Sequence, residues 1–522
     1  MATASCLLAL AACAQLPGKA RLNIVFVLDG MRPDSISIED TPTLWRLRQE
    51  GVNYIDGHAV FPTVTRANAT SIATGTYPGR NGILGNQIYV REYSPNRAFS
   101  NDEYQNLLRL DEVTGGRMVL VKTLAETLTE RGTRFAAVSS GSTGSALLLN
   151  PRAPRGVGVL INAYFEPGKL VAYPPEVNDA ILRRFGPAPK KGGATDPFDS
   201  AVDWTQDLVR EYVLPELKPA VLINWLTEPD HVQHALSAGS PEARRSIRNN
   251  DRHIGLILEK LKALGLLDKV NIFVVSDHGF GLNVFTVNVA SELIAAGLKA
   301  GAESDDVVIA SSGQSILVHV KDRDPEHIDR IARFLRAQEW AGVIFTAARA
   351  GTGNPVHGRV AGTFALELIH LAHAERGPDI VFTFPWTSDR NAHGVPGTDY
   401  SAGSGSTGPR SGTASGHGGM SPWTVRNTFF AWGTDVKRSA TIRVPAGNAD
   451  LTPTLLALVG VKPDGLDGRV LLEALDGGPE PEQVPVETRT YSAEADGGKY
   501  RARIQVTETG GRRYIDKSWR ER

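Results

Sequence analysis

Residues 22–30 read LNIVFVLDG, a near-continuous apolar run that ends in an aspartate and a glycine. Such a run is typical of a parallel strand that is buried on both faces and whose carboxyl end meets solvent. In α/β proteins that end of the strand is where ligands bind. Asp29 is therefore the first candidate functional residue.

The same pattern recurs three times further along the chain, and amphipathic segments with helical periodicity separate the runs. They are FAAVS at 135–139, AVLINW at 220–225 and VNIFVVS at 270–276. Polar residues follow each run directly. Strands that alternate with helices predict an α/β fold, here a doubly wound, mostly parallel sheet flanked by helices.

The pattern loosens after Asn283. Alternation at 307–320 predicts further β structure, and the Gly, Ser and Thr content of 396–419 predicts a long loop of functional interest. The predicted organisation is a leader at 1–20, a catalytic core at 21–285 and 411–480, an insertion or cap at 286–410, and a β-hairpin-like tail at 481–522.

The chain has 56 Lys and Arg against 57 Asp and Glu, and no basic block. This balance argues against binding of a nucleic-acid polymer and favours small partners.

Both cysteines fall within the first fifteen residues, in an apolar stretch too short to span a bilayer. The sequence LAAC at 10–13 resembles the lipobox of bacterial lipoproteins, which implies export. The exported protein would either be anchored to the membrane by a lipid on Cys13 or, after cleavage of a signal peptide, lie in the periplasm. Residues 1–5 contain no Lys or Arg, so an unstructured apolar tail stays open as the alternative.

The candidate nucleophile lies in FPTVTRANATSIATGTYPGRNGILGN, residues 61–86. Here β-favouring residues lead into a segment suited to a helix N-terminus, where backbone N–H groups and the helix dipole attract a phosphate-like anion. A threonine hydroxyl at this junction is either a nucleophile or a simple helix cap. Thr65 is the candidate, and Thr63 is the rival.

Three aspartates and three histidines follow strand ends or lie in glycine-rich sequence. Asp230 and His234 are four residues apart, so a helical turn directs both side chains the same way. A set of carboxylates and imidazoles suits zinc or another divalent transition metal and is too rich in nitrogen for calcium. The full set of candidate ligands is Asp29, Asp230, His234, Asp277, His278 and His417.

Several segments together resemble the alkaline phosphatase superfamily, nearest to its type I phosphodiesterase/nucleotide pyrophosphatase branch. They are VLDGMRPDSI, the 61–86 stretch, LTEPDHVQH, VVSDHGF, SGHGGMSP and DLTPTLLALVGVKPDGLDGRVL, which occur in the family's order. The resemblance covers most of residues 22–285 and 411–472.

This resemblance implies a centre of two divalent ions, expected to be zinc. Asp29, Asp277 and His278 would hold the ion that also binds Thr65, and Asp230, His234 and His417 the other. Thr65 is preferred to Thr63 because it precedes Asn68 by three residues, as the family's nucleophile precedes its asparagine. Asn86 stands where the branch places an amide donor to the phosphoryl group.

The implied activity is hydrolysis of a phosphodiester or nucleotide pyrophosphate through a phosphothreonine intermediate. The loop SGSTGS at 140–145 lacks the Lys and Arg of a related monoesterase branch, which favours a diester. Nucleotide-binding members place aromatic residues where this chain has Arg66 and Trp225, its predicted substrate-binding residues. A phosphomonoesterase, a phosphonate hydrolase and an inactive metal-bearing binding protein stay open as alternatives.

Overall fold

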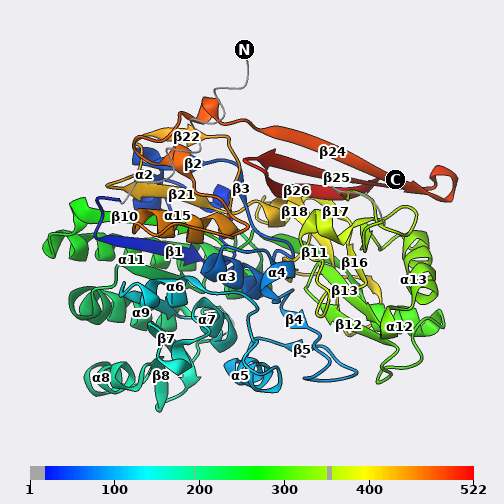
Figure 1. The fold of residues 1–522 in the computed structure, drawn as a ribbon, viewed down its shortest axis with the longest axis horizontal. Coiled ribbons are helices and arrows are strands. Elements are labelled where there is room, and N and C mark those ends of the chain that lie inside the picture. Colours follow the sequence, from blue (N-terminus) through cyan, green and yellow to red (C-terminus); the bar gives the residue numbers. More distant parts are fainter. Residues whose placement is uncertain (1–17, 194, 350–354, 522) are drawn as a thin grey trace.

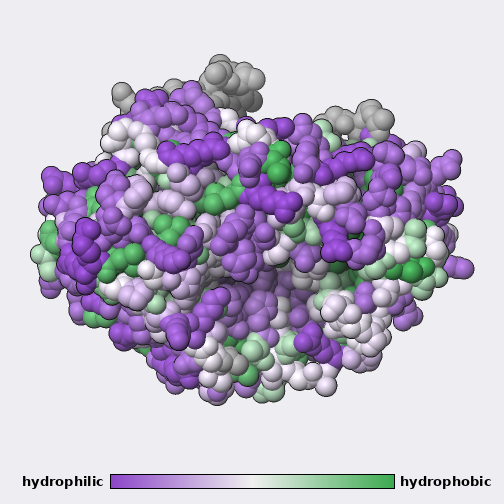
Figure 2. Space-filling view, turned by 90° about the horizontal axis from the view of Figure 1, so that it is seen from below, coloured by the Kyte–Doolittle hydropathy of each residue, from purple (hydrophilic) through white to green (hydrophobic). Residues whose placement is uncertain are grey.

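The computed structural model describes residues 18–193, 195–349 and 355–521. The predictions about Cys6 and Cys13 lie outside these residues. Within them, no helix combines the length and the apolar character needed to cross a membrane. The face drawn in Figure 2 is mostly hydrophilic, with apolar residues scattered over it.

A nine-stranded sheet forms the centre of the molecule (Figure 1), in the order β22-β2-β21-β10-β1-β9-β6-β7-β8. The middle strands β10, β1, β9, β6 and β7 are parallel, whereas β21 and β8 run antiparallel to their neighbours. The bounds are β1 Leu22–Leu28, β2 Val52–Tyr54, β6 Phe135–Ser139, β7 Val159–Glu166, β8 Leu170–Tyr173, β9 Val221–Leu226, β10 Val270–Val275, β21 Phe429–Gly433 and β22 Ala440–Ile442.

Strand β1 is buried on both faces because its side chains point alternately into two apolar cores. Val25 and Val27 pack in the core that contains Ile72, and Ile24 and Phe26 pack in the core on the other face. The first core is covered by α3 Thr65–Thr74, α6 Leu124–Glu130, α7 Thr143–Leu149 and α15 Leu451–Leu458, and the second by α2 Pro42–Glu50, α8 Pro175–Phe185 and α11 Pro241–Ala263. The predicted doubly wound α/β fold is confirmed.

Two smaller sheets follow the first half of the chain. One has the order β12-β13-β16-β14-β15, and the other has β17-β18-β11-β19 with β20 paired to β11. Their bounds are β11 Gly281–Val287, β12 Val307–Ser311, β13 Ser315–Val320, β14 Ile344–Thr346, β15 Phe364–Ala365, β16 Ile380–Thr383, β17 Trp386–Arg390, β18 Pro396–Ala402, β19 Gly408–Pro409 and β20 Ser415–Gly416. Helices α12 Val289–Ala295 and α13 Pro325–Ala337 belong to the same region.

The prediction of one long loop at 396–419 is wrong in its first part. Residues Pro396–Ala402 form β18, which pairs in parallel with β11. The glycine, serine and threonine content of this segment does not predict a strand. The strand forms because the segment is buried in the sheet, and not because of its local propensity.

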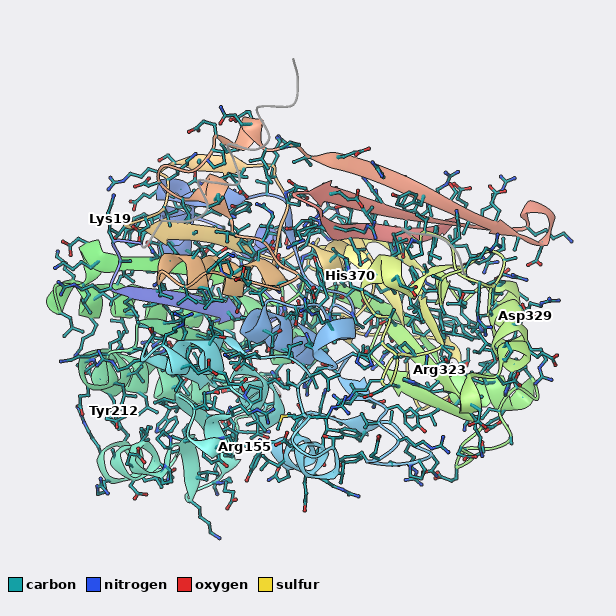
Figure 3. The ribbon with its side chains drawn as sticks, in the orientation of Figure 1. Lys19, Arg155, Tyr212, Arg323, Asp329 and His370 are labelled. Carbon is teal, nitrogen blue, oxygen red and sulfur yellow. The ribbon has the colours of Figure 1, made fainter. Side chains whose placement is uncertain are left out.

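The region after residue 286 is packed directly onto the core. His370 lies where the two meet (Figure 3), and its ring stacks on that of Tyr77 at a centroid distance of 3.8 Å. The carbonyl of His370 also accepts a hydrogen bond of 2.9 Å from the backbone N–H of Gly79. The predicted boundaries of these units stay predictions.

The end of the chain forms three antiparallel strands instead of a two-stranded hairpin. They are β24 Glu487–Ala495, β25 Tyr500–Thr509 and β26 Arg512–Glu521. The tight turn at 496–498 includes Gly497, whose φ is +64°.

Asp399 in β18 gives the fold a pH dependence. Its side chain is buried, and burial raises the pKa of this carboxyl from 3.8 to about 8. Between these two values the unfolded chain has released the proton that the folded chain still holds. Because the unfolded state then binds fewer protons, the free energy of unfolding falls as pH rises, by about 1.4 kcal/mol per pH unit.

Replacing Asp399 by asparagine is expected to remove this pH-dependent loss. The variant should be more stable than the parent by up to about 4 kcal/mol at pH 7, and the difference should vanish near pH 4. Urea unfolding at pH 4 to 8 measures it. A stability difference that does not change with pH would contradict the assignment.

Candidate active site

The candidate residues converge at the carboxyl edge of the central sheet. Asp29 follows β1, Asp277 follows β10, and Asp230 begins α10 Asp230–Leu236 just after β9. Helix α3 starts with Thr65 beside the end of β1 (Figure 1), and His417 directly follows β20. The parallel register of β9, β1 and β10 is what brings these aspartates together.

The structure separates the two candidate nucleophiles. The Thr65 hydroxyl oxygen lies 3.4 Å from His278 Nε2, within the cluster. The Thr63 hydroxyl instead donates to the carbonyl of Gly419 and accepts from the N–H of Gly418, each at 3.0 Å. Thr63 is therefore engaged in holding a loop, whereas Thr65 faces the acidic and imidazole groups.

Each of the three histidines is oriented by a backbone carbonyl. His234 Nδ1 lies 2.9 Å from the carbonyl oxygen of Ser415, His278 Nδ1 3.0 Å from that of Gly279, and His417 Nδ1 2.9 Å from that of Thr63. A carbonyl only accepts, so each Nδ1 carries the proton and each Nε2 keeps its lone pair. This is the tautomer that binds metals through Nε2.

Three carboxylate oxygens aim into the same space. Asp29 Oδ1, Asp230 Oδ1 and Asp277 Oδ2 are buried and have no hydrogen-bond partner among the described residues. They lie 3.7, 3.9 and 3.0 Å from His278 Nε2. Buried oxygens without donors are costly unless a cation approaches them, so this donor set fits divalent metal ions.

Two overlapping groups have ligand atoms that all lie within 4.8 Å of one another. One is Asp29, Asp277 and His278, and the other is Asp230, His278 and His417. His234 lies next to the second group, because its Nε2 is 3.4 Å from Oδ2 of Asp230. The structure thus brings together all six predicted ligands, with His278 placed between the two groups.

The electrostatics of the cluster also favour a cation. Burial and the nearby carboxylates of Asp277 and Asp230 raise the pKa of Asp29 well above its usual range. Burial disfavours a charged His278, but the carboxylates of Asp277 and Asp230 and the carbonyl of Gly279 together outweigh it and raise the pKa of that imidazole. Both shifts mean that protons are attracted to a site with too much buried negative charge, which bound metal ions would compensate.

Asn86 is fixed through its amide oxygen, and its Nδ2 has no hydrogen-bond partner among the described residues. Its Oδ1 accepts a hydrogen bond of 3.1 Å from the backbone N–H of Arg66. Asn101 supports the same loop by donating through Nδ2 to the carbonyl of Gly85 at 2.9 Å. Because Oδ1 is used in this way, Nδ2 of Asn86 can donate to an oxygen of a bound ligand.

Trp225 is placed differently from its predicted role, whereas the prediction that Arg66 binds substrate stays a prediction. The Arg66 side chain is only 13% exposed, and its guanidinium forms an ion pair with Asp102. Trp225 is 1% exposed, and its indole N–H donates to Asp29 Oδ2 at 2.9 Å. The structure thus corrects the prediction that Trp225 binds substrate: it presents no face for stacking and orients a candidate metal ligand.

Sequence reasoning missed most of the groups that orient the ligands. The backbone N–H of Gly30 donates to Asp277 Oδ1 at 2.9 Å, and Gln233 Nε2 donates to the Gly30 carbonyl at 3.0 Å. Gly30 has a φ of +67°, so a glycine directly after a strand-end aspartate was the available signal. The carbonyl partners of the histidines have no sequence signature.

A third group of ligand type lies apart from this site. Asp56, His58 and Asp516 approach one another, but the guanidinium of Arg426 forms an ion pair with Asp56 and lies 3.7 Å from Asp516. A built-in cation already balances these carboxylates, so we assign no metal to them.

A family model described as type I phosphodiesterase/nucleotide pyrophosphatase matches residues 23–386. Venom phosphodiesterase 2 of Crotalus adamanteus is 27% identical over 259 residues, which are 49% of this chain and 26% of that protein. Ectonucleotide pyrophosphatase/phosphodiesterase family member 1 of Mus musculus is 25% identical over 262 residues, 49% of this chain and 24% of that protein. The match thus spans about a quarter of the length of these relatives.

A solved structure of murine ectonucleotide pyrophosphatase/phosphodiesterase 5, an inactive variant in complex with AMP, has the same fold. Its TM-score is 0.58 at 16% identity, covering 87% of this chain and 100% of that chain. The family match extends over well more than half of the sequence. The chain therefore belongs to the type I phosphodiesterase/nucleotide pyrophosphatase family.

Proposed function

We propose that the protein is a metal-dependent hydrolase of phosphodiesters or nucleotide pyrophosphates, with Thr65 as its nucleophile. One observation carries this proposal: the Thr65 hydroxyl lies 3.4 Å from His278 Nε2, in the same cluster as Asp29 Oδ1 and Asp277 Oδ2, buried oxygens with no hydrogen-bond partner among the described residues. A hydroxyl surrounded by metal ligands at a helix N-terminus is suited to attack phosphorus.

Asp29, Asp277 and His278 would hold one divalent ion and Asp230, His234 and His417 the other, with zinc as the expected metal. When bound, the ions lower the pKa of the nucleophilic hydroxyl and stabilise charge on the leaving oxygen. The family relationship and the carbonyl-oriented imidazoles support this assignment.

In the first step a bond forms between Thr65 Oγ1 and phosphorus, and the bond from phosphorus to the leaving alcohol oxygen breaks. The Thr65 proton leaves to solvent, and the alkoxide that departs takes a proton to become an alcohol. The product on the protein is a phosphothreonine that still carries the second ester arm. Asn86 donates through Nδ2 to a non-bridging oxygen, a contribution of roughly a few kcal/mol in the transition state.

In the second step water attacks phosphorus from the side that the alcohol has left. A new bond forms to the water oxygen, the bond to Thr65 Oγ1 breaks, and Thr65 regains a proton. The products are a phosphate monoester and an alcohol, or two phosphate monoesters from a pyrophosphate that carries an ester on each phosphorus. In each step the attacking oxygen and the leaving oxygen lie on opposite sides of phosphorus, as in phosphoryl transfer in general.

A cavity beside the site suits one arm of the substrate. It has a volume of about 350 Å³ and is lined by residues that include Asp102, Tyr164 and Lys191. Because Asp102 pairs with Arg66, the residue after the nucleophile, the cavity adjoins the reacting centre. Its size fits a nucleoside, and the solved relative in complex with AMP supports a nucleotide substrate.

The proposed activity is tested with three nitrophenyl substrates, with and without a chelator. Bis-p-nitrophenyl phosphate and the p-nitrophenyl ester of thymidine 5′-monophosphate report diesterase activity, and p-nitrophenyl phosphate reports monoesterase activity. We expect faster hydrolysis of the diesters, lost on chelation and restored by zinc.

A preference for the monoester would instead indicate that Arg66, one residue after the nucleophile, binds the second free phosphate oxygen. Zinc binding without hydrolysis of any of the three substrates would indicate an inactive binding protein.

A further inference from the structure

We propose that the turn at residues 312–314 positions both Asn86 and His417, so that the region after the core takes part in catalysis. The inference rests on the proposed function, because it concerns the same site. The turn joins β12 to β13 and is closed by a hydrogen bond of 2.9 Å from the Ser312 N–H to the Ser315 carbonyl.

One side of the turn is pressed against the loop that carries His417. The Gln314 N–H donates to the His417 carbonyl at 3.1 Å. A Cβ added to Gly313 would lie 2.4 Å from that same carbonyl oxygen, and one added to Gly418 would lie 1.9 Å from the Ser312 carbonyl. The backbones approach this closely only because both residues are glycines with positive φ.

The other side of the turn is pressed against the loop that carries Asn86. The Ser311 N–H, at the end of β12, donates to Gln87 Oε1 at 3.0 Å. A Cβ added to Gly85 would lie 2.3 Å from Ser312 Oγ. Ser312 is 1% exposed, and its hydroxyl has no hydrogen-bond partner within the described chain, so it acts here by its shape.

The turn therefore lies between a candidate phosphoryl-oxygen donor and a candidate metal ligand that come from distant parts of the sequence. His417 is held from the opposite direction by the Thr63 carbonyl, at 2.9 Å from Nδ1. A shift of the turn would move the two loops relative to Thr65. Displacements of about 1 Å at such positions can cost roughly a hundredfold in rate.

Gly313→Ala tests the contact with His417, and Gly297→Ala is its matched control. Both glycines have a φ of +66°, but a Cβ at Gly297 meets nothing within 4 Å. Zinc affinity of the metal-stripped protein, measured by competition with a chromophoric chelator, is a readout that does not need turnover. We expect Gly313→Ala to lower it roughly 10- to 100-fold, and Gly297→Ala to leave it within about twofold.

Ser312→Val tests the contact with the Asn86 loop. The larger valine side chain should push Gly85 and lower kcat about tenfold or more without changing zinc affinity. If the effect passes through Asn86, Ser312→Val should cost less than about twofold in an Asn86→Ala background.

Equal zinc affinities of Gly313→Ala and Gly297→Ala, or an equal cost of Ser312→Val with and without Asn86, would overturn the proposal. If the parent protein with zinc hydrolyses no phosphodiester, the proposed function fails, and the comparison of zinc affinities still decides the role of the turn.

Discussion

Thr65→Ala is expected to abolish phosphodiester hydrolysis while the protein still binds its metal ions. The Thr65 hydroxyl is the one that lies in the cluster, 3.4 Å from His278 Nε2, and its removal leaves the six candidate ligands in place. Loss of a nucleophile that acts as a unit with its surroundings lowers kcat by roughly four orders of magnitude or more. Initial rates on bis-p-nitrophenyl phosphate and zinc content by atomic absorption measure the two effects.

Two variants make this result specific. Thr65→Ser keeps a hydroxyl and should retain measurable turnover and a burst of covalent phosphoryl-enzyme. Thr63→Ala should remain active but lose stability, by roughly 1–3 kcal/mol, because the buried N–H of Gly418 and carbonyl of Gly419 lose their partner. Turnover in Thr65→Ala above about a tenth of the parent rate would reassign the nucleophile.

The central sheet and the candidate site could both be predicted from the sequence, because both depend on the same buried parallel strands. Parallel strands buried on both faces are largely apolar, so β1, β9 and β10 appear as near-continuous apolar runs, each with a single asparagine. Their carboxyl ends share one edge of the sheet, so the polar residues that follow them must meet. The convergence of Asp29, Asp230 and Asp277 is a consequence of topology.

Features that depend on contacts between distant segments could not be predicted in this way. Trp225 is of a residue type that stacks on nucleobases, but its position in β9 directs the indole inward, where the ring N–H donates to Asp29. Strand β18 is specified by its partner β11 and not by its own residues. The 312–314 turn is an ordinary glycine turn in sequence, and only the fold places it against the loops of Asn86 and His417.

Removal of the metal ions is expected to abolish activity and also to destabilise the fold. Without cations, the buried oxygens Asp29 Oδ1, Asp230 Oδ1 and Asp277 Oδ2 have no hydrogen-bond donor among the described residues. On the proposed assignment zinc would bind the folded chain in preference to the unfolded one, and would raise the free energy of unfolding by about 4 kcal/mol at a thousandfold excess over its dissociation constant. Chemical unfolding of chelated and zinc-loaded protein measures this difference.

Comparison of the two histidines of α10, His234 and His231, tests which of them is a metal ligand. His234 has Nδ1 bonded to the Ser415 carbonyl and Nε2 3.4 Å from Asp230, whereas the His231 ring packs on Phe198 at 4.1 Å. His234→Gln should therefore lose most of the stabilisation by zinc, and His231→Gln should keep it. Equal responses of the two variants would mean that zinc acts elsewhere on the chain, because only a bound ion at this centre distinguishes two imidazoles three residues apart on one helix.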